Sequence, residues 1–148
     1  MCEISLEEFK SLTTKGKIEI RKDWRKCPLE KWNSTTARAY LTECTKAKFN
    51  QEYICNSIRQ ENALMSQFIK QYGRENLKRF IYECMKTYKG NKQYPYPTFG
   101  FMYTYMRQQV LTGILREQAE KKERLEAILR QAQEVTKPED ESWKVELF

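Results

Sequence analysis

Positively charged and aromatic side chains alternate through the segment from Arg74 to Arg107. Cations neutralise phosphates and release counterions, and exposed aromatic rings stack on unpaired bases for about 1–3 kcal/mol each. This combination is what binding of a single-stranded nucleic acid requires. The candidate nucleic-acid-binding residues are Lys78, Arg79, Lys86, Lys89, Lys92, Tyr94, Tyr96 and Arg107.

The same segment also carries the pattern of a buried helix face. Apolar residues recur there at the 3.6-residue spacing of an amphipathic helix, at Leu77, Phe80, Ile81, Cys84, Met85 and Tyr88. Ordinary packing beside solvated lysines therefore explains several of the aromatic residues equally well. Tyr94 and Tyr96 alternate with prolines in a loop, so we expect them to be the most exposed aromatic side chains of the segment.

Other kinds of site chemistry are not indicated. The chain has no histidine, which excludes Ser–His and Cys–His nucleophilic catalysis. Its 5 glycines form neither GxxxxGK nor GxGxxG, so no phosphate-cradling loop is present. Its 5 cysteines include no CxxC pair and indicate neither a zinc site nor a disulfide framework. We therefore predict a protein that acts by binding, with no catalytic residues, no metal and no cofactor.

The elements that would position these residues are helices, and the sequence predicts an all-α, mainly helical single domain. A capping box at Ser5–Glu8 begins a short helix to about Leu12, and Gly16 is expected to end it. Alternation over Lys17–Arg21 favours a short extended segment. Further helices are expected over 34–49, 57–72 and 74–88, followed by a loop over 89–98 and a long helix that ends at Thr136–Pro138.

The domain boundaries follow from composition. We predict one helical domain over 1–135, with a firm core at 29–116 and a helical extension at 117–135, and an acidic, flexible tail over 136–148. The extension carries only a narrow apolar seam, so it is expected to project or to pair with a partner helix. Residues 37–107 hold 12 basic and 5 acidic side chains, whereas 136–148 hold 2 and 4. Positive charge is thus concentrated in the central segment.

The cellular setting is predicted from the same features. The N-terminus, MCEISLEEF, lacks a basic region followed by an apolar stretch, and no run approaches the roughly 18 apolar residues of a membrane span. The lack of a disulfide framework among the 5 cysteines favours a reducing compartment. We expect a cytoplasmic protein without a membrane partner.

Two stretches carry a resemblance to a known group of proteins. KWNSTTARAYL and YGRENLKRFIYECMKTYKGNKQYPYPTFGFMYTYM, within residues 31–107, resemble the small helical replication proteins of phages and mobile elements of Gram-positive bacteria. The resemblance implies an accessory factor for DNA replication that recruits or regulates a helicase or polymerase. The missing phosphate loop argues against the ATP-dependent type of helicase loader.

The C-terminal segment is a candidate partner-binding peptide. Its large apolar residues are Trp143, Val145, Leu147 and Phe148. The last five residues, KVELF, are similar to the peptide by which bacterial proteins occupy the groove of the sliding clamp, although Lys144 stands where that motif prefers glutamine. Docking of this segment on the protein's own body, or binding to another partner, is equally compatible with the sequence.

Two functions remain open from the sequence. The first is a nucleic-acid-binding accessory factor in DNA replication or its control, encoded by a phage or mobile element, with single-stranded nucleic acid as its ligand. The alternative is a protein-binding inhibitor or adaptor directed at a host machine, without affinity for nucleic acid. The oligomeric state is left undetermined by either interpretation.

Overall fold

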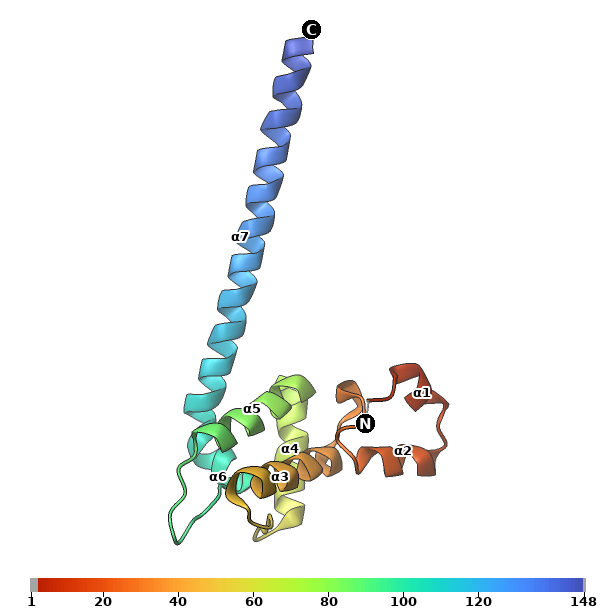
Figure 1. Cartoon of the computed structure of the whole chain (residues 1–148), viewed down its shortest axis with the longest axis vertical. Coiled ribbons are helices and arrows are strands. Elements are labelled where there is room, and N and C mark those ends of the chain that lie inside the picture. Colours follow the sequence, from red (N-terminus) through yellow and green to blue (C-terminus); the bar gives the residue numbers. More distant parts are fainter. Residues whose placement is uncertain (1–2, 148) are drawn as a thin grey trace. The chain divides into compact units, whose positions relative to one another are not determined.

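The computed structural model describes residues 3–147, with side chains as far as residue 133 (Figure 1). Every regular element in that range is helical, which confirms the predicted all-α class. The chain divides into two compact units, Met1–Leu111 and Thr112–Phe148. The elements in order are α1 Leu6–Ser11, α2 Thr14–Arg21, η1 Leu29–Lys31, α3 Ser34–Phe49, α4 Ile58–Tyr72, α5 Arg74–Thr87, α6 Phe99–Phe101, η2 Met102–Met106 and α7 Arg107–Leu147.

The N-terminal segment is helical where an extended strand was expected. Ser5 caps α1 through its hydroxyl, which accepts from the Glu8 N–H at 3.1 Å, as predicted. Thr13 then caps α2 in the same way, accepting from the Gly16 N–H at 3.1 Å. Gly16 therefore lies inside the first turn of a new helix, and the expectation of an extended Lys17–Arg21 segment was wrong. The helix places Lys17 and Arg21, four residues apart, over the Phe9 ring.

Three helices, α3, α4 and α5, pack against one another and form the body of the first unit. Their predicted boundaries are confirmed by the caps: the Asn33 side chain accepts from two N–H groups at the start of α3, and Ser57 accepts from Gln60 at the start of α4. Gly73, between α4 and α5, has a φ of 92°, a conformation that favours glycine. Figure 1 shows α1 and α2 beside this body, at the end opposite to the loop that follows α5.

The core of the first unit is aromatic. Phe68, Phe80 and Phe99 are fully buried, and their ring centroids lie 5.0–6.5 Å apart in tilted and edge-on arrangements. The predicted apolar stripe of α5 faces this core, because Leu77, Phe80, Ile81, Cys84 and Met85 are all buried. Phe99 connects the core to the C-terminal half of the chain, since it begins the helical segment that follows the loop.

That segment is not a regular α-helix at its start. Thr98 caps α6 through its hydroxyl, and η2 is a π-helical stretch over Met102–Met106 that leads into α7. The sequence did not predict this π-helical stretch. Such stretches hold more residues per turn than an α-helix does and are frequent at functional sites.

The second unit is the continuation of α7. Its apolar seam is solvent-exposed, with Leu125, Ile128 and Leu129 at 55–62% exposure. The helix was expected to end at Thr136–Pro138, whereas α7 reaches Leu147. Pro138 removes one backbone hydrogen bond without ending the helix. Among residues 3–147 we find no helix with the length and apolarity needed to span a membrane.

Candidate nucleic-acid interface

Four aromatic rings form a connected row along one side of the first unit. Phe49 at the end of α3 contacts Tyr88 with 6.2 Å between ring centroids, Tyr88 contacts Phe101 at 5.7 Å, and Phe101 contacts Tyr105 at 5.0 Å. Exposure rises along this aromatic row from the half-buried Phe49 and Tyr88 to Phe101 at 39% and Tyr105 at 73%. One end of the row thus presents ring faces to solvent.

The exposure of Phe101 and Tyr105 follows from the spacing of the aromatic residues around them. Aromatic residues occur at every second position from Phe99 to Tyr105. Residues two apart on a helix lie about half a turn from each other, so Phe99 and Tyr103 occupy one side while Phe101 and Tyr105 occupy the other. Phe99 is buried in the core, and the alternate pair is therefore solvent-facing.

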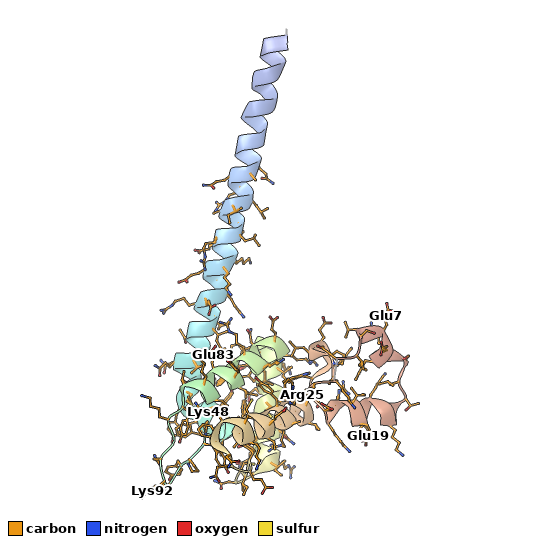
Figure 2. All side chains as sticks on the ribbon, in the orientation of Figure 1. Glu7, Glu19, Arg25, Lys48, Glu83 and Lys92 are labelled. Atoms are coloured by element: carbon orange, nitrogen blue, oxygen red, sulfur yellow. The ribbon has the colours of Figure 1, made fainter. Side chains whose placement is uncertain are left out.

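Three exposed lysines lie near Tyr88 of the row in sequence. Lys86 lies in the last turn of α5, and Lys89 and Lys92 lie in the following loop, all three on the solvent side. Figure 2 shows Lys92 at the tip of this loop. The loop also carries Tyr94, which is 60% exposed, in agreement with its predicted exposure. The Tyr88 hydroxyl donates to the Tyr94 carbonyl at 2.8 Å and so connects the loop to the aromatic row.

Lys48 holds the end of α5 in place beside the row. Its ammonium group donates to the carbonyl oxygens of Met85, of Lys86 at 2.8 Å and of Tyr88 at 3.2 Å. These carbonyls belong to the last turn and cap of a helix, where a cation is favourable. The same ammonium lies 5.1 Å from the centroid of the Phe49 ring. Lys48 therefore fixes the geometry between Phe49 and Tyr88.

The remaining predicted residues lie elsewhere or have a structural contact. Lys78 places its ammonium 5.2–5.8 Å from the ring centroids of Trp24, Trp32 and Tyr40. Arg79 is half-buried on α5 and makes further interactions. Lys86, Lys89, Lys92 and Tyr94 thus lie exposed on the last turn of α5 and the following loop, and Lys78 lies two turns of α5 or more before them.

Tyr96 and Arg107 also have partners within the fold. The Tyr96 hydroxyl accepts from the Ile54 N–H at 3.0 Å and donates to the Ile54 carbonyl at 3.3 Å, which anchors the loop on the segment before α4. Arg107 stacks on Tyr103, 4.0 Å from its centroid, on the side of the helix opposite to Phe101 and Tyr105. Tyr96 is half-buried and therefore contradicts the expectation of exposure.

A buried polar network supports the start of the helix that carries the row. The Tyr53 hydroxyl donates to Oε1 of Glu61 at 2.6 Å and accepts from the Phe99 N–H at 2.8 Å. Oε2 of Glu61 accepts from the Gly100 N–H at 3.3 Å, and Arg38 lies 3.7 Å from Oε1. Burial, followed by the hydrogen bond to Glu61, raises the pKa of the Tyr53 hydroxyl, so that it remains a donor.

A cavity of about 380 Å³ opens next to the exposed end of the row, between the start of α4 and η2. Phe101 and Tyr105 form one wall, and polar side chains from α4 form another. Glu61, which is only 5% exposed, contributes to its lining. Further polar side chains in the lining are Asn56, Ser57, Gln60, Thr98 and Thr104.

A second surface hollow of about 310 Å³ lies between α3 and α5. Cys44, Ala47, Tyr82 and Met85 make it largely apolar, with Lys48 and Lys86 at its rim. Burial raises the pKa of the Cys44 thiol, which therefore stays neutral at physiological pH and behaves as a small apolar group. This hollow suits an apolar side chain of a protein better than a polar base edge.

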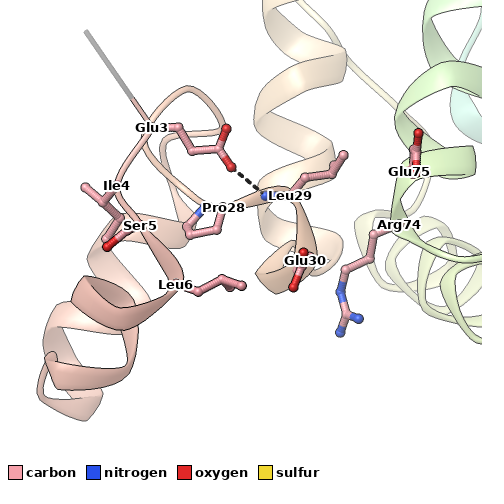
Figure 3. Close-up of a pocket in the computed structure, with 9 residues that line it drawn as sticks. All are labelled: Glu3, Ile4, Ser5, Leu6, Pro28, Leu29, Glu30, Arg74 and Glu75. Carbon is pink, nitrogen blue, oxygen red and sulfur yellow. Dashed lines mark hydrogen bonds between the residues drawn. The ribbon is translucent and has the colours of Figure 1, made fainter.

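Another cavity, of about 640 Å³, lies at the N-terminal side of the first unit (Figure 3). Its lining contains Glu3, Glu30 and Glu75 against the single cation Arg74, a balance that disfavours phosphates. Its polar groups already serve the fold: Glu3 accepts from the Leu29 N–H at 2.9 Å, and Arg74 donates to the Trp32 carbonyl at 2.6 Å. We assign no ligand to this cavity.

The C-terminal candidate peptide lies beyond the described side chains. Trp143, Val145 and Leu147 fall in the part of α7 whose side chains are not described, and Phe148 lies outside the described residues. Within the described part, no group of three metal-ligating side chains comes together. No family model, curated protein or solved structure matches this chain.

Proposed function

We propose that this protein is a nucleic-acid-binding accessory factor that acts in DNA replication or its control, with single-stranded nucleic acid as its ligand. The observation that carries the proposal is the aromatic row, whose exposed end lies on the same unit as three exposed lysines. Binding, rather than catalysis, is the activity. The link to replication, the phage or mobile-element origin and the cytoplasmic setting rest on the sequence resemblance and composition described above.

The aromatic row supports a single-stranded ligand rather than a duplex. Bases of a single strand have free ring faces, and each base stacked on an exposed aromatic ring contributes about 1–3 kcal/mol. Tyr105 and Phe101 provide two such faces with 5.0 Å between centroids, and Tyr94 provides a third on the loop. Bases inside a duplex are stacked on each other and cannot use these faces.

The lysines support contacts with the phosphate backbone. Lys86, Lys89 and Lys92 lie within seven consecutive residues and are all exposed. Lys48 already donates to carbonyl groups at the end of α5, so we assign the contacts with phosphates to the three exposed lysines. Such contacts act through charge and carry no sequence preference.

Fluorescence anisotropy of a labelled oligothymidylate, in low salt, tests the stacking part of the proposal. Tyr105→Ala should weaken binding about tenfold, because one stacked base is lost. Tyr82→Ala is the matched control, since Tyr82 is also exposed, at 51%, but lines the hollow between α3 and α5. Equal effects of the two substitutions, or no binding by the unaltered protein, would refute the assignment.

A second function is favoured by one observation, the apolar hollow between α3 and α5. Burying one bulky apolar side chain of a partner there would contribute about 1.5–3 kcal/mol before ordering costs. This supports the alternative of a protein-binding inhibitor or adaptor, to which the candidate peptide Trp143–Phe148, with its sliding-clamp-like end, also belongs. This alternative would be favoured if Tyr82→Ala lost binding to a protein partner while Tyr105→Ala kept it.

A further inference from the structure

We infer that the cavity beside Phe101 and Tyr105 takes one unpaired base of the bound strand and prefers guanine. The inference rests on the proposed function and names the base that the same surface selects. It follows from three features that meet at this cavity: two exposed rings, a buried carboxylate with unused acceptor sites, and a volume suited to one base.

Two aromatic rings provide the stacking surface of the site. Phe101 and Tyr105 line the cavity and are solvent-exposed, so a base that enters it has an aromatic partner for stacking. The volume of about 380 Å³ lies near the lower end of the roughly 300–1,000 Å³ found for small-molecule sites. A single nucleoside fits that size better than two consecutive bases.

The Glu61 carboxylate provides the hydrogen-bond acceptors of the site. Glu61 pairs with Arg38 at 3.7 Å, and a carboxylate in such a pair only accepts hydrogen bonds. Its two oxygens offer about four acceptor positions, of which Tyr53 and the Gly100 N–H occupy one each. Both oxygens thus have a partner within the fold, and each has a further lone pair that can accept from a ligand that enters the cavity.

Guanine matches these acceptor positions best among the bases. Its Watson–Crick edge presents two adjacent donors, N1–H and the N2 amino group, which match the two oxygens of a carboxylate. Thymine and uracil present one donor between two acceptors, and those acceptors would face the carboxylate unfavourably. A well-formed bidentate contact between a side chain and a base discriminates strongly against the wrong base.

The test uses oligothymidylates of equal length with one central guanine, inosine or thymine, measured against the unaltered protein. The guanine strand should bind about tenfold more tightly than the thymine strand. Inosine, which keeps N1–H but lacks the amino group, should fall between them. Equal affinities for the three strands would overturn the inference while leaving the proposed single-strand function intact.

Two further experiments test the role of Glu61 and distinguish a base within a strand from a free nucleotide. Glu61→Gln should remove the preference for guanine, and its circular dichroism spectrum and melting temperature show whether the variant folds. The base series on the unaltered protein decides the question if that variant does not fold. Deoxyguanosine monophosphate alone should compete only weakly, because it lacks the neighbouring phosphates and bases. Competition as strong as that of the guanine strand would assign the cavity to a free nucleotide and overturn the inference.

Discussion

Replacing Tyr53 with phenylalanine removes one hydroxyl from the centre of the polar network that supports the aromatic row. The hydroxyl donates to Glu61 at 2.6 Å and accepts from the Phe99 N–H at 2.8 Å. A hydrogen bond to a charged group contributes about 1.5–3 kcal/mol, and an N–H left without an acceptor costs about 1–3 kcal/mol. We therefore expect the free energy of unfolding to fall by about 3 kcal/mol, a large share of the roughly 5–15 kcal/mol of a typical domain.

Urea denaturation followed by circular dichroism measures this change, with Tyr94→Phe as the matched control. Tyr94 is 60% exposed, and its hydroxyl contacts only the Gln93 side chain, at 3.4 Å, so its loss should change stability by less than about 0.5 kcal/mol. The melting temperature should fall by about 10 °C for Tyr53→Phe. If both variants unfold within about 0.5 kcal/mol of each other, the network does not support the row as described.

Two other predictions follow from the supports of the helices. Lys48→Met should lower the free energy of unfolding by about 1–2 kcal/mol, because the charged donor to the end of α5 is lost while the apolar stem is kept. Lys46→Met on the same helix is the control and should have little effect. Equal losses of stability in urea denaturation for the two variants would contradict the capping role of Lys48. Burial, followed by the charge of Glu83, raises the pKa of Cys84 from 9.0 to about 12. The contribution of this neutral thiol to the free energy of unfolding is fully present below pH 9. It decreases as pH rises toward 12, by up to about 1.4 kcal/mol per pH unit. Cys84→Ala should flatten that decline in urea titrations between pH 8 and 10, and an unchanged slope would show that the thiol does not cause it.

The helices of the body were predictable because their signals are local. The caps at Asn33 and Ser57 and the glycine at Gly73 mark their ends, and the apolar stripe of α5 marks its buried face. These features depend on residues near in sequence, so sequence patterns capture them. The prolines predicted exposure of both Tyr94 and Tyr96, which is right for Tyr94 and wrong for Tyr96, because the Tyr96 hydroxyl bonds to the distant Ile54.

The sequence could not show where distant segments meet. Lys17–Arg21 alternates like a strand, yet Thr13 provides a cap, and the helix places Lys17 and Arg21 on the ring of Phe9. Lys78 looked available for phosphates, but its partners Trp24, Trp32 and Tyr40 lie far away in sequence.

The exposed pair Phe101 and Tyr105 did have a local signal. Aromatic residues at every second position of a helix cannot all face the core, because residues two apart lie on opposite sides. The choice of which pair is buried depends on Phe68 and Phe80, whose packing against Phe99 is a long-range contact. The alternation therefore requires that one pair is exposed but does not identify it.

The salt dependence of binding to an oligothymidylate tests the central claim most directly. Three phosphate contacts on a single strand predict a slope of about −2 for the logarithm of the binding constant against the logarithm of salt concentration. Replacing Lys86, Lys89 and Lys92 together with glutamine should bring the slope close to zero. The same replacement of Lys10, Lys15 and Lys70, which are exposed elsewhere on the first unit, removes equal charge and should leave the slope near −2. Equal slopes for the two triple variants would contradict the proposed interface.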